Sequence, residues 1–374
     1  MRKENQFSPF QMALFFQQFA SSQSVGRRST IENSDDDGIY LGALNPFFID
    51  KEKIRLSKSL RRLNDKTQVF VDRQNNPHLR NRRTHTDEVV SVAVYIATIL
   101  GLNVHLVEAI ALGHDIGHTP YGHIGERAIS ELAGRKFTHQ VMSLVIAQKV
   151  ERSGKGLNLS WETLEGILNH SRGDGQLIMN RSLPLEYAVV MFADKIAYTF
   201  SDLNDALRCS YFQESQLPAE FFALGKSQRE RTNNCILHLV KESAEKQFIS
   251  FSDSQVAQQF ESLRQWSFHN FYRKLDHEVQ REAVYDDFKK VYPFLEDIFG
   301  KLGHNVFLAL ALMTDSEIRK ITLTLKKDKK KIYAPGFFSS FGFYEILSNL
   351  PKNSKIDIFN ADLDKSKFKR FDAW

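Results

Sequence analysis

Three strongly apolar segments, each with titratable side chains inside it or at one end, constrain the fold of this chain more than any other feature. They are "HTDEVVSVAVYIATIL" (85–100), "VHLVEAIALGHD" (104–115) and "PLEYAVVMFADKIAY" (184–198). Their apolar residues follow a helical pattern, which predicts buried helices. Because a buried carboxylate or imidazole must be paired, neutralised or bound to a metal, something between neighbouring helices is expected to bind these groups together.

The rest of the chain is also mainly helical in pattern. Residues 215–320 predict several further amphipathic helices. After them, "ITLTLKKDKKKIYAPG" (321–336) alternates in the way typical of a strand that reaches a lysine-rich turn, and "SKIDIF" (354–359) could pair with it. We therefore expect an all-α protein with a small C-terminal β or irregular segment.

Composition narrows the class of protein and the chemistry of any metal site. No stretch has the roughly 20 apolar residues of a membrane span, and the polar start lacks a secretory signal. We therefore expect a cytoplasmic protein with no membrane contact. The two cysteines, Cys209 and Cys235, are too few for a disulfide framework or a thiolate zinc site. Any metal must then be held by nitrogen and oxygen, and the net charge of +5 favours anionic ligands.

One short segment concentrates titratable groups. "HDIGHTPYGHIGE" (114–126) contains three histidines, an aspartate and a glutamate. Its first pair, His114 and Asp115, ends an apolar helix, while His85 and Asp194 lie in two others. Two imidazoles and two carboxylates suit manganese, iron, zinc or a similar divalent ion. Taken alone, His85 is better read as a satisfied core histidine, and a lone buried Asp194 could pair with an arginine.

The order of the motifs resembles that of the HD-domain deoxynucleoside triphosphate triphosphohydrolases, the dGTPase-like proteins. The resemblance covers about residues 46–320 and rests on "SLRRLNDKTQVF" (59–70), "NRRTHTDEV" (81–89), "HDIGHTPYGHIGE" (114–126), "FTHQ" (137–140), "ETLEGILNH" (162–170), "ADKIAYTFSDLNDAL" (193–207) and "LMTD" (312–315). It implies an HD-domain helical bundle whose metal ligands are His85, His114, Asp115 and Asp194.

The resemblance also implies the catalytic side chains. The family's "GHxGE" places acid and base chemistry on His123 and Glu126, three positions apart on one face if a helix resumes after Gly122. His118 and His139 match histidines that lie along the phosphates in relatives. "FTHQ" departs from the commoner "FEHN", so an ordinary loop or cap role stays open for His139.

Substrate contacts carry over in the same way. Gln68 and Asp202 match residues that meet the sugar 3'-hydroxyl, Arg82 matches a phosphate-binding arginine, and Tyr198 matches a tyrosine under the deoxyribose. Asp194, Tyr198 and Asp202 recur every four residues, which puts them on one helix stripe. A tyrosine against C2' leaves no room for a 2'-hydroxyl.

Lys195 departs from the "DDIAY" of most bacterial relatives. The lysine also occurs in the vertebrate branch, where it contacts phosphate, so we expect a phosphate-binding cation. The alternative is a lysine on the helix surface.

The expected reaction is metal-dependent hydrolysis of a 2'-deoxynucleoside 5'-triphosphate, dGTP or dNTPs generally, to the deoxynucleoside and inorganic triphosphate, with Mg²⁺ on the substrate phosphates. One alternative is an HD phosphohydrolase acting on another nucleotide, such as a 5'-nucleotidase or a phosphodiesterase. Another is a subunit without catalytic activity that binds nucleotides or nucleic acid.

The resemblance further implies a homo-oligomer, a dimer, tetramer or hexamer, with an allosteric dNTP or single-stranded DNA as candidate regulators. We divide the chain into an N-terminal extension (1–45), the catalytic core (46–215), a helical part of the same catalytic unit (216–325) and a C-terminal tail (326–374).

Overall fold

The structure is a computed structural model that describes residues 9–20, 45–71, 76–171, 183–276, 280–300, 303, 305–351 and 355–360. Within these ranges all named elements are helices, and the extended backbone is limited to one isolated bridge between Thr67 and Asn81. The prediction of an all-α protein is therefore confirmed.

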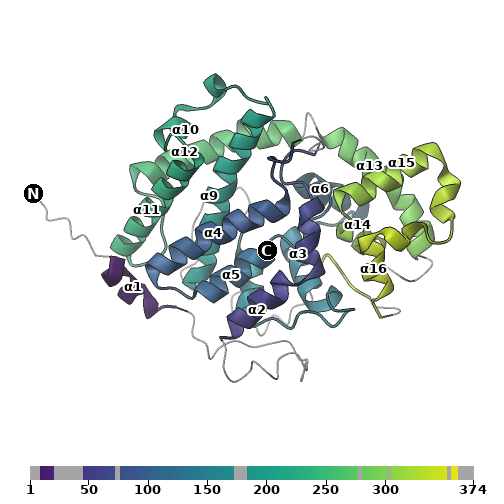
Figure 1. Cartoon of the computed structure of the whole chain (residues 1–374), viewed down its shortest axis with the longest axis horizontal. Coiled ribbons are helices and arrows are strands. Elements are labelled where there is room, and N and C mark those ends of the chain that lie inside the picture. Colours follow the sequence, from purple (N-terminus) through teal and green to yellow (C-terminus); the bar gives the residue numbers. More distant parts are fainter. Residues whose placement is uncertain are drawn as a thin grey trace, which may run out of the picture.

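Helices of different length make up the described chain (Figure 1). The α-helices are α1 (Pro9–Gln17), α2 (Pro46–Arg55), α3 (Lys58–Arg62), α4 (Arg82–Leu100), α5 (Val104–Gly113), α6 (Gly122–Ala133), α7 (His139–Val145), α8 (Trp161–Asn169), α9 (Leu185–Arg208), α10 (Ala219–Ala223), α11 (Gln228–Lys246), α12 (Gln255–Ser267), α13 (Arg281–Leu295), α14 (Val306–Leu312), α15 (Asp315–Lys327) and α16 (Gly342–Ser348). Three π-helical turns extend them, η4 (Ile146–Val150), η6 (Phe268–Tyr272) and η8 (Glu296–Gly300), and four 3-10 turns are η3 (Leu63–Asp65), η5 (Glu214–Gln216), η9 (Lys329–Tyr333) and η10 (Phe337–Ser340).

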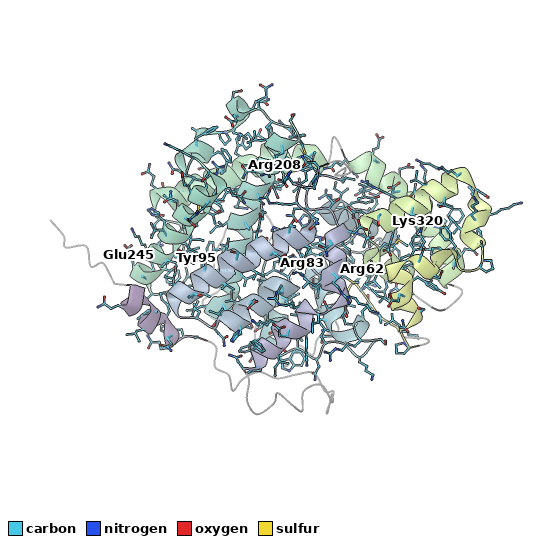
Figure 2. All side chains as sticks on the ribbon, in the orientation of Figure 1. Arg62, Arg83, Tyr95, Arg208, Glu245 and Lys320 are labelled. Carbon is cyan, nitrogen blue, oxygen red and sulfur yellow. The ribbon has the colours of Figure 1, made fainter. Side chains whose placement is uncertain are left out.

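The three apolar segments singled out in the sequence form the centre of the molecule. Helix α4 packs along both α9 and α5, and α2 and α8 cover α5. Side chains fill the spaces between the ribbons (Figure 2). Tyr95, which is 52% exposed, marks the outer face of α4, whereas Val89 and Ile96 on its inner face are fully buried. This burial on one face is what the helical spacing predicts.

Local signals fix the ends of these helices. Asn81 caps α4 in a reciprocal capping box with Thr84, and Gly101 ends the helix in the left-handed region with φ 67°. Ser160 caps α8 through its side chain, and Pro184 precedes the first residue of α9. The start and end of α4, and the starts of α8 and α9, are therefore fixed by residues of the local sequence.

The predicted C-terminal strands are wrong. Residues 321–327 belong to α15, whose buried positions Ile318, Ile321 and Leu325 recur at helical spacing. Alternation of Thr and Leu over five residues imitated a strand, but the capping box of Thr314 with Glu317 starts a helix before it. In the second segment Ser354 lies outside the described residues, and 355–360 form no strand.

The N-terminal extension is described only in part. Its amphipathic segment forms α1, which packs on α4. Residues 1–8 and 21–44, predicted to be weakly ordered, lie outside the described residues. Among the helices that the structure describes, none combines the length and apolar character needed to cross a membrane.

Candidate metal centre and active site

The four predicted metal ligands come from three helices that meet in the core. His85 lies in the first turn of α4, His114 and Asp115 follow α5, and Asp194 lies in the middle of α9. Ligand atoms of His85, His114 and Asp115 all lie within 4.8 Å of one another. Asp194 reaches this group through His85, whose Nε2 is 3.2 Å from its Oδ1. The structure thus gathers side chains that are up to 109 residues apart in the sequence, from 85 to 194.

The ring orientation suits a bound cation. His114 Nδ1 donates to the carbonyl oxygen of Ala111 at 2.7 Å, because a carbonyl can only accept. Its Nε2 faces Asp115 Oδ1, 3.4 Å away. Nδ1 of His85 is buried and has no hydrogen-bond partner among the described residues. Two imidazoles and two carboxylates that are buried together form a donor set that fits a divalent ion.

The two carboxylates remain ionised in spite of burial. For Asp194, burial alone favours the neutral acid, but the hydrogen bond with His85 and the ammonium of Lys195 lower its pKa below the ordinary value. For Asp115, His114, His118 and Arg82 outweigh burial and also lower the pKa. Arg82 Nη1 donates to Asp115 Oδ2 at 2.8 Å. The predicted phosphate-binding arginine thus holds a predicted metal ligand in this structure.

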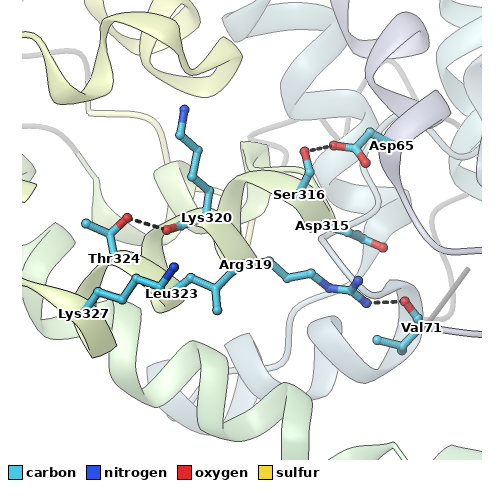
Figure 3. Close-up of a pocket in the computed structure, with 9 residues that line it drawn as sticks. All are labelled: Asp65, Val71, Asp315, Ser316, Arg319, Lys320, Leu323, Thr324 and Lys327. Atoms are coloured by element: carbon cyan, nitrogen blue, oxygen red, sulfur yellow. Dashed lines mark hydrogen bonds between the residues drawn. The ribbon is translucent and has the colours of Figure 1, made fainter. Parts of the chain in front are cut away.

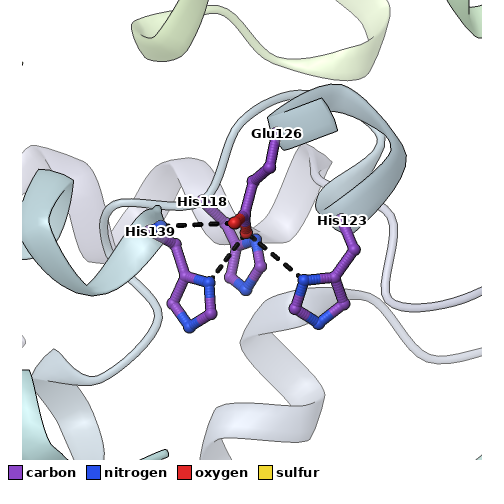
Figure 4. Close-up of side chains that lie close together, drawn as sticks. All are labelled: His118, His123, Glu126 and His139. Carbon is purple, nitrogen blue, oxygen red and sulfur yellow. Dashed lines mark hydrogen bonds and ion pairs between the residues drawn. The ribbon is translucent and has the colours of Figure 1, made fainter. Parts of the chain in front are cut away.

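A second group of side chains surrounds the carboxylate of Glu126 (Figure 4). Its Oε1 lies 2.9 Å from His118 Nδ1, 2.7 Å from His139 Nδ1 and 3.4 Å from His123 Nδ1. The rings of His118 and His139 stack with centroids 3.8 Å apart. These two imidazoles and Glu126 are buried, whereas the side chain of His123 is 59% exposed. His123 is therefore the one of the three histidines that faces solvent from the group.

The first and second groups touch through His118. Its Nε2 lies 3.2 Å from Asp115 Oδ1, although neither ring nitrogen has hydrogen-bond geometry toward its neighbours. Burial lowers the pKa of His118 to about 3, so its imidazole is neutral near pH 7. A buried Glu126 between histidines stays ionised because His139 and His118 lower its pKa against the effect of burial.

Close packing explains the glycines of this segment. A Cβ at Gly117 would lie 2.2 Å from the backbone nitrogen of Ser143 and 2.4 Å from the carbonyl oxygen of His139, so only glycine lets the turn after α5 rest on α7. Tyr121 and Gly122 both have positive φ, 61° and 58°, and α6 begins directly after this turn. The expected helix after Gly122 is present and carries His123 and Glu126 on one side.

The other end of the α9 stripe is a group of polar and aromatic side chains around the buried Asp202. Asp202 accepts a hydrogen bond from the hydroxyl of Tyr272 at 2.9 Å, and Tyr272 contacts the ring of Tyr198 edge to face, with centroids 5.9 Å apart. Burial raises the pKa of Asp202 to about 7. Lys195 is buried between the two ends, 3.8 Å from Asp194 and 5.2 Å from the Tyr198 ring. It is therefore not a lysine on the helix surface.

Gln68 lies in the segment between η3 and α4. The side-chain oxygen of Gln68 is buried and has no hydrogen-bond partner among the described residues, while its carbonyl accepts from Arg82 Nη2 at 3.5 Å. Asp315 ties this loop to the turn before α6, because its carboxylate accepts from the backbone nitrogens of Thr67 and Tyr121, both at 2.9 Å.

A separate cavity of about 530 Å³ lies along α15 (Figure 3). It shares Asp315 with the loop just described, and Arg319 on its wall donates to the carbonyl of Val71. The four predicted metal ligands and Glu126 do not line this cavity. The cavity adjoins Val71, in the same segment as Gln68, and does not form part of the metal centre.

Sequence reasoning missed several residues that the fold brings to the site. His170 lies at the end of α8 and contacts the ring of His114, with centroids 5.0 Å apart. It is the last residue of the quoted "ETLEGILNH", so a histidine within a motif was the available signal. Tyr272 and Arg264 lie near Tyr198 in α12 and η6, and their amphipathic segment gave no such signal.

Comparisons with known proteins identify the sequences that this chain is similar to. Residues 82–199 match the HD domain family, a span that contains the four predicted metal ligands. The chain is 35% identical over 257 residues to the deoxyguanosinetriphosphate triphosphohydrolase-like protein of Clostridium tetani, covering 67% of this chain and 72% of that protein. A protein of the same name from Caldanaerobacter subterraneus is 38% identical, covering 67% and 76%. One from Clostridium perfringens is 36% identical, covering 75% and 81%.

Proposed function

This chain belongs to the family of deoxyguanosinetriphosphate triphosphohydrolase-like proteins, which are HD-domain phosphohydrolases, and on that premise we propose that it hydrolyses 2'-deoxynucleoside 5'-triphosphates to the deoxynucleoside and inorganic triphosphate. The observation that carries the proposal is the stripe on α9. It aligns a metal-centre carboxylate, a buried lysine, a tyrosine ring and a second buried carboxylate in an order that matches phosphate, sugar and 3'-hydroxyl.

In this proposal His85, His114, Asp115 and Asp194 hold a divalent cation, either manganese, iron, zinc or a similar ion. When bound, such a cation supplies a Lewis acid that polarises a phosphoryl oxygen and acidifies water. The protein's own contribution is a dry site in which Arg82 and the backbone of Ala111 fix the orientation of the ligands.

His123 carries the proton transfer. Its Nδ1 faces Glu126 Oε1 at 3.4 Å, so the carboxylate orients the ring. The opposite ring nitrogen is free to face the substrate, because the side chain is 59% exposed. From there His123 either protonates the departing 5'-oxygen or acts on the attacking water.

The remaining contacts distinguish a deoxynucleoside triphosphate from other nucleotides. Lys195 and Arg82 offer positive charge to the phosphates, where Mg²⁺ would add further charge, and neutral His118 can donate to a phosphate oxygen, with His139 stacked beside it. Tyr198 supports the deoxyribose. Gln68, whose buried oxygen lacks a partner among the described residues, and Asp202 bind the 3'-hydroxyl.

Product identity tests the proposal. The purified chain is incubated with each of the four dNTPs, singly and mixed, with Mn²⁺ and with Mg²⁺, and the phosphate product is identified. Tripolyphosphate together with the deoxynucleoside supports the proposal, and activity only in mixtures indicates an allosteric dNTP. Single-stranded DNA is added in a parallel series as the other candidate regulator.

The same assay separates the rival functions. Orthophosphate released from dNMP indicates a 5'-nucleotidase, and cleavage of a cyclic or diester substrate indicates a phosphodiesterase. A binding subunit without activity is indicated if Asp115→Ala leaves nucleotide or nucleic-acid binding unchanged. The homo-oligomer, the cytoplasmic location and the division of the chain at residues 45, 215 and 325 remain predictions.

A further inference from the structure

We propose that Asp315 is a positioning residue, whose carboxylate joins the turn that presents His123 to the segment that presents Gln68 and so sets how the two side chains meet one substrate. The inference deepens the proposed function and rests on it, because the roles of those two side chains are assigned there. The motif "LMTD" (312–315), which ends in Asp315, has no other part in the proposed chemistry.

The carboxylate of Asp315 binds two segments that are far apart in the sequence. Its Oδ1 accepts a hydrogen bond from the backbone nitrogen of Tyr121 at 2.9 Å, and its Oδ2 accepts from the backbone nitrogen of Thr67, also at 2.9 Å. The hydroxyl of Thr67 donates to the same Oδ2. All three residues are buried, so loss of the carboxylate would leave buried N–H groups unpaired, which is costly.

Both segments lead directly to side chains of the proposed site. Thr67 precedes Gln68, and Tyr121 lies two residues before His123. Helix α6 begins at Gly122, so the position of the Tyr121 nitrogen sets where the first turn of this helix, with His123, begins. A misplacement of about 1 Å can cost roughly 100-fold in rate. The distance between these two segments therefore matters for the reaction.

The turn before α6 needs contacts from outside, because its backbone is unfavourable for a residue with a side chain. Tyr121 has a φ of 61°, in the left-handed region, and such a conformation persists where surrounding contacts determine it. At the other end of the turn, Lys66 Nζ donates to the carbonyl oxygen of His118. The hydroxyl of Tyr121 donates to Asp287 at 2.8 Å, but this bond restrains the side chain and not the backbone nitrogen. Asp315 supplies the contact to that nitrogen.

Capping of α15 does not account for this arrangement. Asp315 is the first residue of α15, a position where an acidic side chain often stabilises the helix (Figure 3). The capping box of Thr314 with Glu317 already takes that role, since the carboxylate of Glu317 accepts from the Thr314 nitrogen at 2.8 Å. Each oxygen of Asp315 instead accepts from another segment, one from Tyr121 and the other from Thr67.

Hydrogen exchange tests whether Asp315 holds the two segments, and it needs no substrate. Exchange in the full-length parent chain and in Asp315→Ala is followed by mass spectrometry on peptides that cover residues 65–70 and 116–123. Exchange in these peptides should be about tenfold faster or more in the variant, with the peptides of α9 unchanged. Unchanged exchange in the two segments, or a uniform increase along the whole chain, overturns the proposal.

Asp315→Asn gives a second test that does not depend on the folding of Asp315→Ala. The amide keeps one oxygen acceptor, but its NH₂ group must face a backbone N–H, so one of the two segments loses its partner. Faster exchange in one segment, with the other as in the parent chain, is expected. Parent-like exchange in both segments overturns the proposal.

A double-mutant cycle tests whether these contacts serve catalysis. In Asp315→Ala, kcat for dGTP should fall about 10-fold to 100-fold, KM should rise because Gln68 also moves, and bound Mn²⁺ should stay as in the parent chain. In a chain that already carries His123→Gln, the same substitution should lower kcat by less than about threefold, because Asp315 acts on kcat through His123. Losses that multiply in the double variant would mean a general structural role and overturn the proposal.

Two controls localise the effect. Ser316→Ala changes the next residue of α15, whose exposed side chain donates to Asp65, and should keep the kcat and KM of the parent chain. Tyr121→Phe removes the bond to Asp287 but keeps the backbone nitrogen bonded to Asp315, so kcat should stay within about threefold of the parent value. A loss in either control as large as that in Asp315→Ala overturns the proposal.

The positioning role and the proposed function can fail separately. If the parent chain cleaves no dNTP, the proposed function is wrong, and hydrogen exchange still decides whether Asp315 holds the two segments. If the parent chain cleaves dNTPs and Asp315→Ala matches it in exchange and in kcat, only the positioning role is wrong.

Discussion

The two ends of the stripe on α9 carry the same residue type with opposite pKa shifts. Asp194 and Asp202 are both buried and lie eight residues apart on one helix. The pKa of Asp194 falls below its ordinary value because His85 and Lys195 counter the effect of burial. The pKa of Asp202 rises to about 7 because burial dominates and its direct partner is the neutral hydroxyl of Tyr272.

The difference shows how one helix supports two kinds of chemistry. An ionised carboxylate beside imidazoles is a cation ligand, whereas a carboxyl poised near neutral pH is suited to hydrogen bonding with a sugar hydroxyl. Substitution of Asp194 should therefore leave the sugar contact of Asp202 intact, and substitution of Asp202 should leave metal binding by Asp194 intact. The following substitutions test that independence, beginning with the largest expected effect.

Asp194→Asn should abolish or strongly weaken metal binding. The amide is a poor substitute for an ionised ligand, so kcat/KM for dGTP should fall about 1,000-fold or more. Bound Mn²⁺, measured by elemental analysis, should fall with it. Asp202→Asn is the matched control and should keep its metal. Equal metal content in the two variants would contradict the assignment of ends.

His123→Gln should stop the chemistry while both ends of α9 stay intact. We expect kcat to fall about 100-fold or more with KM nearly unchanged, because the residue lies at the exposed edge of the site. Steady-state kinetics with dGTP measures the split. A large rise in KM at constant kcat would mean that His123 only binds substrate.

Tyr198→Ala should weaken the selection of deoxyribose over ribose. Loss of the ring opens space at C2', so the preference for dGTP over GTP should fall about tenfold to 100-fold. The ratio of kcat/KM values for the two substrates measures this selectivity. Tyr95→Ala, on the outer face of α4, serves as the aromatic control, and an unchanged ratio in Tyr198→Ala would remove this residue from sugar selection.

Asp202→Asn should change the pH dependence of stability. The unfolded carboxyl titrates near 4 and the folded one near 7, so the folded state binds the proton more tightly. Stability from this group is fully present below about pH 4 and is lost as pH rises through 7. Without metal, the parent chain should lose on the order of 1 to 3 kcal/mol between pH 4 and 8 that Asp202→Asn does not lose.

Urea unfolding at pH 5 and pH 8, both with chelator, measures the difference between the two chains. The effect should be smaller than the full shift allows, because local relaxation and water reduce it. Parallel pH dependences in the parent and the variant would show that Asp202 ionises near its ordinary pKa.

Tyr272→Phe should have the smallest effect. It deletes the shorter of two hydrogen bonds that side chains donate to Asp202, the other coming from Ser201. The loss of about 0.5 to 1.5 kcal/mol should raise KM roughly twofold to tenfold with metal content unchanged. Because that bond also lowers the pKa of Asp202, the pH profile of KM should move to higher pH. A shift to lower pH would contradict the role of this hydroxyl.

Much of the architecture could be predicted from local pattern. Apolar spacing predicted the buried helices that the structure shows as α4, α5 and α9 before any contact was known. The same kind of reasoning failed at 321–327, where five alternating residues imitated a strand inside α15. Periodicity over a short window does not distinguish the two, and the cap of α15 lay outside that window.

The sequence by itself determined the helices, the donor types and the spacing that puts Asp194, Tyr198 and Asp202 on one stripe, because these depend on neighbours along the chain. Tertiary structure alone decided that Lys195 is buried, that Arg82 holds Asp115, and that His170 faces His139. It also gave two like carboxyls opposite pKa shifts. Desolvation and charge pairing depend on distances between segments far apart in the sequence, which no local pattern contains.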